Sequence, residues 1–216
     1  MGESKPIIMS CAAQCSLLNF EVAHLQDITK IAERICKSRF LELQEQWKRG
    51  SWDIDRTNCL VEIPEYHLYI QAYLATLKAL LDLLAQLASS EGIVDKRVHG
   101  FHKKGNQIGG ELLLILQTKA FPQYAEIASK LLRLIKEHKI TWIDQVGKLR
   151  DNLVHPTKGM PLVMFGLELQ VVSDNLRLMR ILQPTIDGQY FADYAQKTLG
   201  NAEIFSKDFL SILKSA

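Results

Sequence analysis

The sequence is poor in the residues that make tight turns, with 12 glycines and 6 prolines among 216 residues. An all-β fold needs many turns, so this scarcity argues against one. The chain also lacks an excess of charge of one sign, because 26 Lys and Arg are set against 24 Asp and Glu, which gives a net charge of +2. A site for a polyanion would therefore have to be a local patch. Hydrophobic residues make up 47% of the chain and charged residues 23%, a balance that allows a real core and excludes general disorder.

Cysteine is scarce and shows no metal-binding pattern. The four cysteines, Cys11, Cys15, Cys36 and Cys59, form no CxxC pair, and no histidines follow them at zinc-finger spacing. A chain of this length does not need disulfides, so reduced thiols in a cytoplasmic protein are expected. The sequence also lacks the glycine-rich nucleotide loops, the HExxH zinc motif and the GxSxG nucleophile motif. We therefore predict no metal site and no cofactor.

Neither a secretory signal nor a membrane span is predicted. The N-terminal segment lacks the basic start and the continuous apolar run of a signal peptide. The most apolar window, from Leu68 to Leu87, contains Lys78 and Asp82 near its middle. Each of these charges would be costly inside a bilayer. The window thus predicts a buried bundle helix in a cytoplasmic protein that has no membrane partner.

Apolar residues recur at helical spacing over most of the chain. This periodicity predicts helices over residues 20–48, 64–89, 121–138, 141–155 and 191–212. The fold class is therefore mainly all-α, an antiparallel helical bundle. We find no internal repeat, no low-complexity linker and no boundary between two domains. We predict one helical domain that spans the whole chain (1–216), in which about the first 15 residues are candidates for disorder.

The helix after residue 140 has the clearest start and end. Thr141 and Asp144 form an approximate capping box, and Pro156 ends the helix. Its apolar residues fall on one face at about 100° per residue. They are Trp142, Val146, Leu149 and Leu153.

Two stretches depart from the helical pattern. Apolar and polar residues alternate near 162–172, which predicts one strand or a small hairpin. Ser173 can then cap a short helix that runs to Leu182 and is stopped by Pro184. The stretch 95–110 is rich in glycine and basic residues and predicts a solvated loop.

One short segment, KLRDNLVHP from Lys148 to Pro156, carries the functional signal. Arg150 is followed directly by polar residues and, five positions later, by His155. The predicted helix ends at this point, so both side chains lie near a helix terminus.

Two other Arg and His pairs have the same spacing, so spacing alone is not specific. Arg97 and His102 fall in the glycine-rich loop. Arg133 and His138 lie among charged neighbours, which is typical of a solvated helix end. Only the segment at Arg150 has a polar residue directly after the arginine and a proline directly after the histidine.

This segment and its helical surroundings resemble the catalytic signature of HEPN domains. The resemblance implies an all-α bundle. Many HEPN proteins are metal-independent RNases that dimerise to bring two motifs together, while others bind nucleotides or serve as partners of minimal nucleotidyltransferases. The resemblance therefore implies an endoribonuclease of the toxin or defence type. It would act on RNA as a homodimer, with an antitoxin or a nucleotidyltransferase as a further candidate partner.

The candidate catalytic residues are Arg150, Asp151, Asn152 and His155. His155 fits the proton-transfer role, Arg150 can bind a phosphate bidentately, Asp151 can orient the imidazole, and Asn152 can donate a further hydrogen bond. On an ideal helix Arg150 and His155 lie about 140° apart, whereas Asp151 and His155 share a face. Pro156 biases His155 out of the helical region. The imidazole can then turn toward Arg150 or toward the motif of a second chain.

Two other functions stay open. The chain can be a non-catalytic HEPN-like bundle that binds a nucleotide or a partner protein. It can also be a purely structural dimerisation domain, for which the regular apolar seam of the helix over 191–212 is the positive sign.

Overall fold

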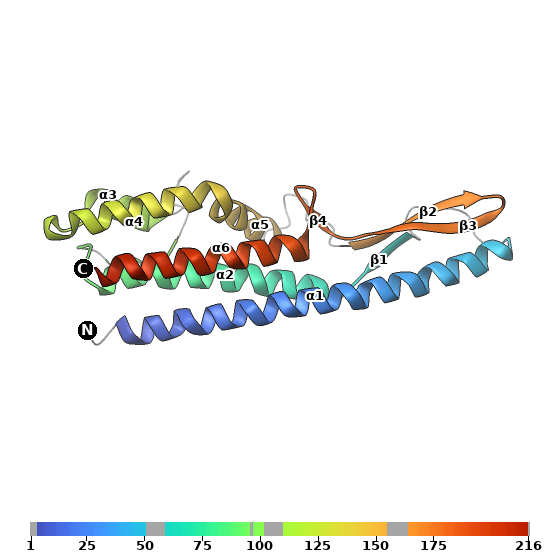
Figure 1. The fold of residues 1–216 in the computed structure, drawn as a ribbon, viewed down its shortest axis with the longest axis horizontal. Coiled ribbons are helices and arrows are strands. Elements are labelled where there is room, and N and C mark those ends of the chain that lie inside the picture. The colour runs from blue at the N-terminus through green and yellow to red at the C-terminus, as the bar shows by residue number, and fades with distance from the viewer. Residues whose placement is uncertain (1–3, 51–58, 96, 102–109, 155–163, 216) are drawn as a thin grey trace. The chain divides into compact units, whose positions relative to one another are not determined.

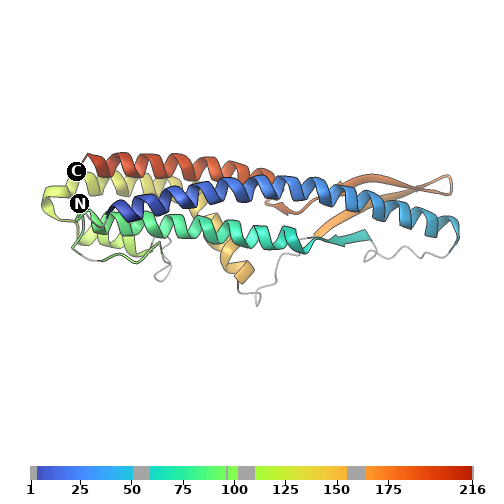
Figure 2. The same ribbon diagram turned by 90° about the horizontal axis from the view of Figure 1, so that it is seen from below.

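The computed structural model of the protein describes residues 4–50, 59–95, 97–101, 110–154 and 164–215 (Figures 1 and 2). Helices dominate the described chain, and small antiparallel sheets accompany them. The predicted fold class, mainly helical with a small β segment, is confirmed at this level.

The elements follow one another along the chain as labelled in Figure 1. The α-helices are α1 (Ser4–Lys48), α2 (Pro64–Ser90), α3 (Gly110–Thr118), α4 (Ala125–His138), α5 (Asp144–Val154) and α6 (Phe191–Lys214). Short turns of 3-10 helix and π-helix flank α4, and these are η2 (Pro122–Tyr124) and η3 (Lys139–Ile143). The strands are β1 (Leu60–Glu62), β2 (Met164–Val172), β3 (Asn175–Leu182), β4 (Thr185–Ile186) and β5 (Gln189–Tyr190).

The chain divides into two compact units, each built from separate stretches of sequence. The first, which we call the helical unit, comprises Met1–Glu21, Gln71–Met160 and Lys197–Ala216. The second, which we call the sheet unit, comprises Val22–Ile70 and Pro161–Gln196. Helices α1, α2 and α6 contribute residues to both units, so the single domain predicted from the sequence stays a prediction.

Helix α1 is longer than its sequence pattern suggested. It begins at Ser4 instead of near residue 20 and ends at Lys48. Cys11 and Leu18 lie seven residues apart on its buried side, with 3% and 0% exposure, and anchor the N-terminal part. The sequence leaves disorder open for about the first 15 residues, and the structure describes residues 4–15 as part of this helix.

Helix α2 confirms the prediction over 64–89. It begins at Pro64, a residue that suits the first turn of a helix. Within it, Lys78 and Asp82 form an ion pair with each other. The Asp82 carboxylate also accepts a hydrogen bond of 2.7 Å from the backbone N–H of Phe101, which ties the start of the glycine-rich stretch to α2.

The predicted start of a helix at Thr141 is wrong. Helices α4 and α5 are joined without a break by the π-turn η3, so no helix terminus needs a cap there. The Thr141 hydroxyl instead donates to the carbonyl of His138, at 3.0 Å. The apolar stripe is confirmed, because Trp142, Val146 and Leu153 are buried. The axis changes direction at η3 (Figure 2), as expected of a π-turn.

Helix α6 confirms the predicted C-terminal helix. Its seam is buried within the chain at Thr198, Ala202, Phe205 and Phe209. The seam is therefore occupied by the protein's own core and does not offer a face to a second chain.

The sheet unit holds a three-stranded antiparallel sheet in the order β1, β2, β3. The strand predicted near 162–172 is confirmed as β2, whereas β1 was not predicted. The short helix expected from Ser173 to Leu182 is wrong, because that stretch forms β3. Ser173 and Asp174 have φ values of 49° and 63°. They make the two-residue turn that joins the two strands.

One face of this sheet forms the core of the sheet unit. Phe165 and Leu176 are buried, and the ring of Phe165 meets Tyr66 edge to face with centroids 5.2 Å apart. Two side chains of α1 bind the hairpin. Gln44 and Trp47 donate to the carbonyls of Leu176 and Asp174, at 3.1 and 2.9 Å.

Candidate functional site

Helix α5 places Asp151 on the side away from its buried stripe, whereas Arg150 and Asn152 are half-buried beside the stripe. The three residues are consecutive and lie shortly before the end of the helix at Val154. The Arg150 side chain is 34% exposed and that of Asp151 is 54% exposed. His155 lies outside the described residues. The predicted convergence of Arg150 and His155 therefore stays a prediction.

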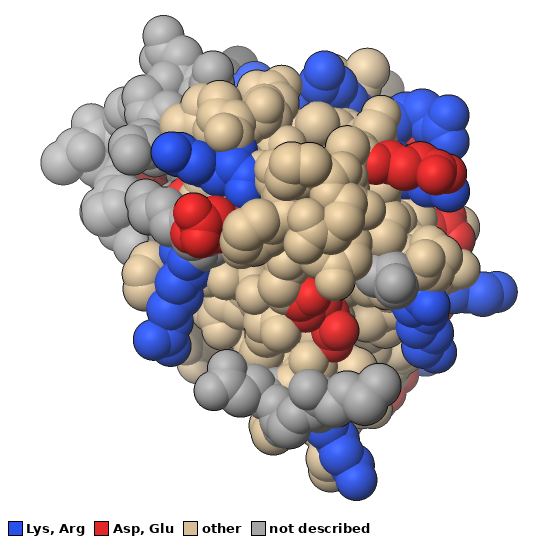
Figure 3. Space-filling model, turned by 90° about the vertical axis from the view of Figure 1, so that its left-hand side faces the viewer, with Lys and Arg blue, Asp and Glu red and all other residues tan. Residues whose placement is uncertain are grey.

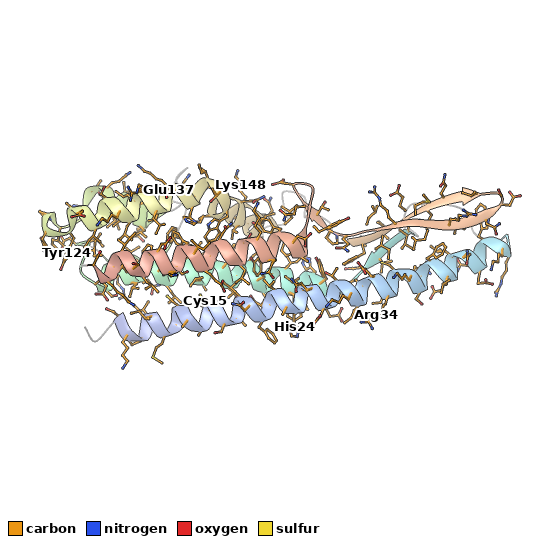
Figure 4. All side chains as sticks on the ribbon, viewed as in Figure 1. Cys15, His24, Arg34, Tyr124, Glu137 and Lys148 are labelled. Carbon is orange, nitrogen blue, oxygen red and sulfur yellow. The ribbon has the colours of Figure 1, made fainter. Side chains whose placement is uncertain are left out.

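Arg150 and Asp151 form an ion pair with each other, with 3.2 Å between guanidinium and carboxylate. The sequence predicted that Asp151 orients His155, and the structure shows the carboxylate at Arg150. Lys148, labelled in Figure 4, adds a second exposed cation on the same helix. An incoming anion would have to displace Asp151 from the guanidinium.

A surface pocket of about 400 Å³ opens beside Arg150. Helix α2 contributes Gln71, Leu74 and Ala75, and α5 contributes Arg150 and Leu153. Leu74 and Leu153 are almost fully buried, with 1% and 7% exposure, and form an apolar floor. The volume of the pocket falls within the range of pockets that hold small ligands. The pocket can thus take a group that has one flat apolar face and one negative charge.

The two other Arg and His pairs have different surroundings. Residues 97–101 are held to neighbouring helices through backbone groups: the N–H of Val98 donates to Ser89 and that of His99 to Glu111. This described part of the glycine-rich stretch is therefore more ordered than the solvated loop predicted from sequence. His102 lies outside the described residues.

For the third pair, Arg133 and His138, the prediction of a solvated helix end is wrong for the histidine. Arg133 is exposed, as predicted, and lines a separate pocket of about 290 Å³ with Glu137 and Asp208. His138, in contrast, is half-buried, and its Nδ1 accepts a hydrogen bond of 2.9 Å from the Trp142 indole. The spacing of four residues between histidine and tryptophan was the signal that could have placed the two on one helix face.

The end of the protein seen in Figure 3 carries charged side chains of both signs. The face seen in Figure 3 has an uncharged centre, with basic and acidic side chains distributed around it. Such a distribution agrees with the net charge of +2. On this face a polyanion would meet no continuous basic surface.

Among the described residues no group of three or more His, Cys, Asp or Glu side chains could hold a metal ion. Cys11, Cys15 and Cys36 are free thiols, and burial raises the pKa of Cys11 and Cys36 to about 11. Helices α1 and α2 are long and apolar enough to cross a membrane, with 22% and 50% of the apolar window buried inside the protein. The cytoplasmic location stays a prediction.

Comparisons of the chain with protein-family models, with curated proteins and with solved structures found no match.

Proposed function

We propose that this protein is a HEPN-like, metal-independent endoribonuclease of the toxin or defence type that acts as a homodimer. The supporting observation is that Arg150 lines an open pocket in the helical unit, directly before the sequence that contains His155. In this proposal Arg150 binds the scissile phosphate, and His155 transfers protons.

The proposed reaction needs two proton transfers and one stabilised anion. A base removes the proton of a ribose 2′-hydroxyl, whose oxygen attacks the adjacent phosphorus. The bond to the 5′-oxygen breaks, and an acid gives that oxygen its proton, which leaves a 2′,3′-cyclic phosphate. Histidine suits both transfers at neutral pH, and a guanidinium stabilises the charge on phosphorus. Two copies of His155 in a symmetric dimer would supply separate base and acid.

Asp151 and Asn152 have supporting roles in this proposal. The Asp151 carboxylate holds the guanidinium of Arg150 in the free protein and can turn to the imidazolium once a phosphate has replaced it. Asn152, which is half-buried at the same turn, can donate a hydrogen bond to the phosphate.

A second candidate function is a non-catalytic module that binds a nucleotide or a partner protein. The ion pair of Arg150 with Asp151 favours the form that binds a partner protein, because a guanidinium that is already neutralised binds any phosphate, that of a nucleotide included, less tightly. The apolar floor of the pocket serves either function.

Cleavage of RNA in EDTA, measured beside thermal melts and light scattering, tests the proposal. His155→Ala and Arg150→Ala should each reduce cleavage at least about a hundredfold, while stability changes by less than about 1 kcal/mol. Asp151→Asn should lose less, because the imidazole remains. The matched controls are His99→Ala and Arg133→Ala, which remove exposed side chains elsewhere on the helical unit.

Three results would contradict the nuclease. They are equal cleavage by wild type and His155→Ala, activity that requires added Mg²⁺ or Mn²⁺, and a monomer at about tens of micromolar. A protein without cleavage whose nucleotide binding still depends on Arg150 would instead support the non-catalytic module.

A further inference from the structure

The junction between α4 and α5 has a histidine built into it. His138 is the last residue of α4, and the π-turn η3 (Lys139–Ile143) begins directly after it. The backbone N–H of Asp144 donates to the carbonyl of Lys139, five residues back, which is the bond that defines this turn. Short π-turns inside helices are uncommon and are often found at functional positions.

A side-chain hydrogen bond between Trp142 and His138 spans this turn. The Trp142 indole N–H donates to Nδ1 of His138, at 2.9 Å. An indole N–H can only donate, so Nδ1 must carry a lone pair and the imidazole proton must be on Nε2. The bond therefore requires neutral His138.

The surroundings make protonation of His138 costly. Trp142 is 2% exposed and Phe205 of α6 is fully buried, and the Phe205 ring lies 5.1 Å from the imidazole. A protonated ring would place an N–H on Nδ1 opposite the indole N–H, which breaks the bond and leaves a buried donor without an acceptor.

The charged groups around His138 act in both directions. Burial lowers the pKa of His138, whereas Asp208 on α6 and Glu137 on its own helix raise it. Glu137 is labelled on α4 in Figure 4. Across the turn, Lys139 is paired with Asp144 at 3.0 Å. Burial outweighs the two carboxylates, so the imidazole is neutral near pH 7.

We propose that His138 and Trp142 form a pH-sensitive joint between α4 and α5. While His138 is neutral, the indole–imidazole hydrogen bond keeps the π-turn η3 in the conformation seen in the structure. Protonation releases Trp142, and α5 moves with respect to α4. This joint is independent of the proposed nuclease, although any function of Arg150 would respond to it, because Arg150 lies on α5.

The sign of the stability change follows from the direction of the shift. The pKa of His138 is lower in the folded than in the unfolded protein. The joint therefore contributes its full stability above the ordinary histidine pKa and loses it as pH falls through the folded value.

The test follows the ¹H–¹⁵N indole signals of the three tryptophans between about pH 7.5 and pH 4.5. Single Trp→Phe variants assign these signals. In the wild type the Trp142 indole and the backbone amides of α5 should titrate together, with neutral His138 in the Nε2–H form by long-range ¹⁵N spectra. In His138→Gln the amide oxygen still accepts from Trp142 but cannot be protonated, so the Trp142 titration should disappear. His99→Gln, which removes an exposed imidazole, should keep it.

The proposal is overturned if wild-type Trp142 does not respond over this range, or if His138→Gln titrates like the wild type. Nδ1–H as the neutral tautomer would overturn it as well. That measurement uses the unmodified protein and so decides the matter even if the His138→Gln variant does not fold.

Discussion

The helical unit and the sheet unit form their cores in different ways. In the helical unit, the fully buried ring of Phe205 meets the rings of Phe101, Trp142 and Phe209, with centroids 6.3, 6.0 and 5.7 Å apart. These rings come from segments that are far apart in the sequence. One residue thus links several elements, and its loss should be felt across the whole unit.

The sheet unit depends more on the geometry of its turns. Its three-stranded sheet buries one face, and a hairpin joins β2 to β3 in this sheet. A second hairpin joins β4 to β5 in a separate two-stranded sheet. Both hairpin turns place residues at positive φ, with 49° at Asp187 and 79° at Gly188 in the second. Side-chain packing therefore contributes most to the stability of the helical unit. In the sheet unit, the backbone conformation of the turns contributes more to defining the fold.

The largest effect is expected from Phe205→Ala. Removing a fully buried phenyl ring leaves a cavity and should lower the free energy of unfolding by about 4 kcal/mol, measured by chemical denaturation. Ile204→Ala is the matched control, because this neighbour is 55% exposed and should cost less than about 1 kcal/mol. Equal losses in the two variants would show that the aromatic cluster does not hold the helical unit together.

A smaller effect is expected from Gly→Ala substitutions. They should lower the free energy of unfolding in the sheet unit and raise it in the helical unit. Gly188→Ala places a Cβ on a left-handed residue and should cost about 1–2 kcal/mol. Gly200→Ala, in the middle of α6, meets no described atom within 4 Å of the new Cβ. It should gain about 0.5–1 kcal/mol, because alanine favours the helix. Urea unfolding of both variants gives the two signs, and changes of the same sign would contradict the contrast between the units.

The helices could be predicted because their signal is local. A spacing of three and four residues is visible within one stretch of sequence, as for Trp142, Val146 and Leu153. The start of α1 was missed because Cys11 and its small or polar neighbours give little contrast between faces. The π-turn was missed because Thr141 and Asp144 have the types and spacing of a cap, although the chain never leaves the helix there.

The strands were harder because their partners are distant. Strand β1 has only three residues, and Val61 pairs with Phe165 more than a hundred positions away. In β3, Met179 is an extra residue that has no partner opposite it on β2. It breaks the alternation, so Leu178 and Ile181 are three residues apart, as on a helix. Ser173 then suggested a helix cap where the chain makes a turn.

The candidate site shows the same limit. Arg150 and Asp151 were found because they are neighbours in one motif. The pocket needed Gln71 from α2, about 80 residues earlier, and no local pattern connects the two. His138 was misjudged because its sequence neighbours are charged, whereas its spatial neighbours Trp142 and Phe205 are aromatic.

A buried carboxyl group gives a further contrast between the units. Glu21 in the helical unit is 4% exposed, and its Oε2 has no hydrogen-bond partner among the described residues. Glu33 in the sheet unit is half-buried and accepts a hydrogen bond of 2.9 Å from Gln183. Burial raises the pKa of Glu21, and the hydrogen bond from Thr76, at 2.9 Å, lowers it by less.

The smallest effect is expected from Glu21→Gln. Because the pKa of Glu21 is higher in the folded state, wild-type stability falls as pH rises from the unfolded through the folded pKa. Glutamine keeps the acceptor for Thr76 and carries no charge. The variant should therefore be about 0.5 kcal/mol more stable than the wild type at about pH 8, with the difference shrinking toward about pH 4. Thr76→Val should instead lose more stability at the higher pH than at the lower pH. The hydrogen bond from the Thr76 hydroxyl stabilises the ionised Glu21 carboxylate more than the protonated carboxyl group. Unfolding of all three proteins at both pH values measures this, and a gain for Glu21→Gln that grows at acid pH would show that the wild-type carboxylate is stabilised by a charge.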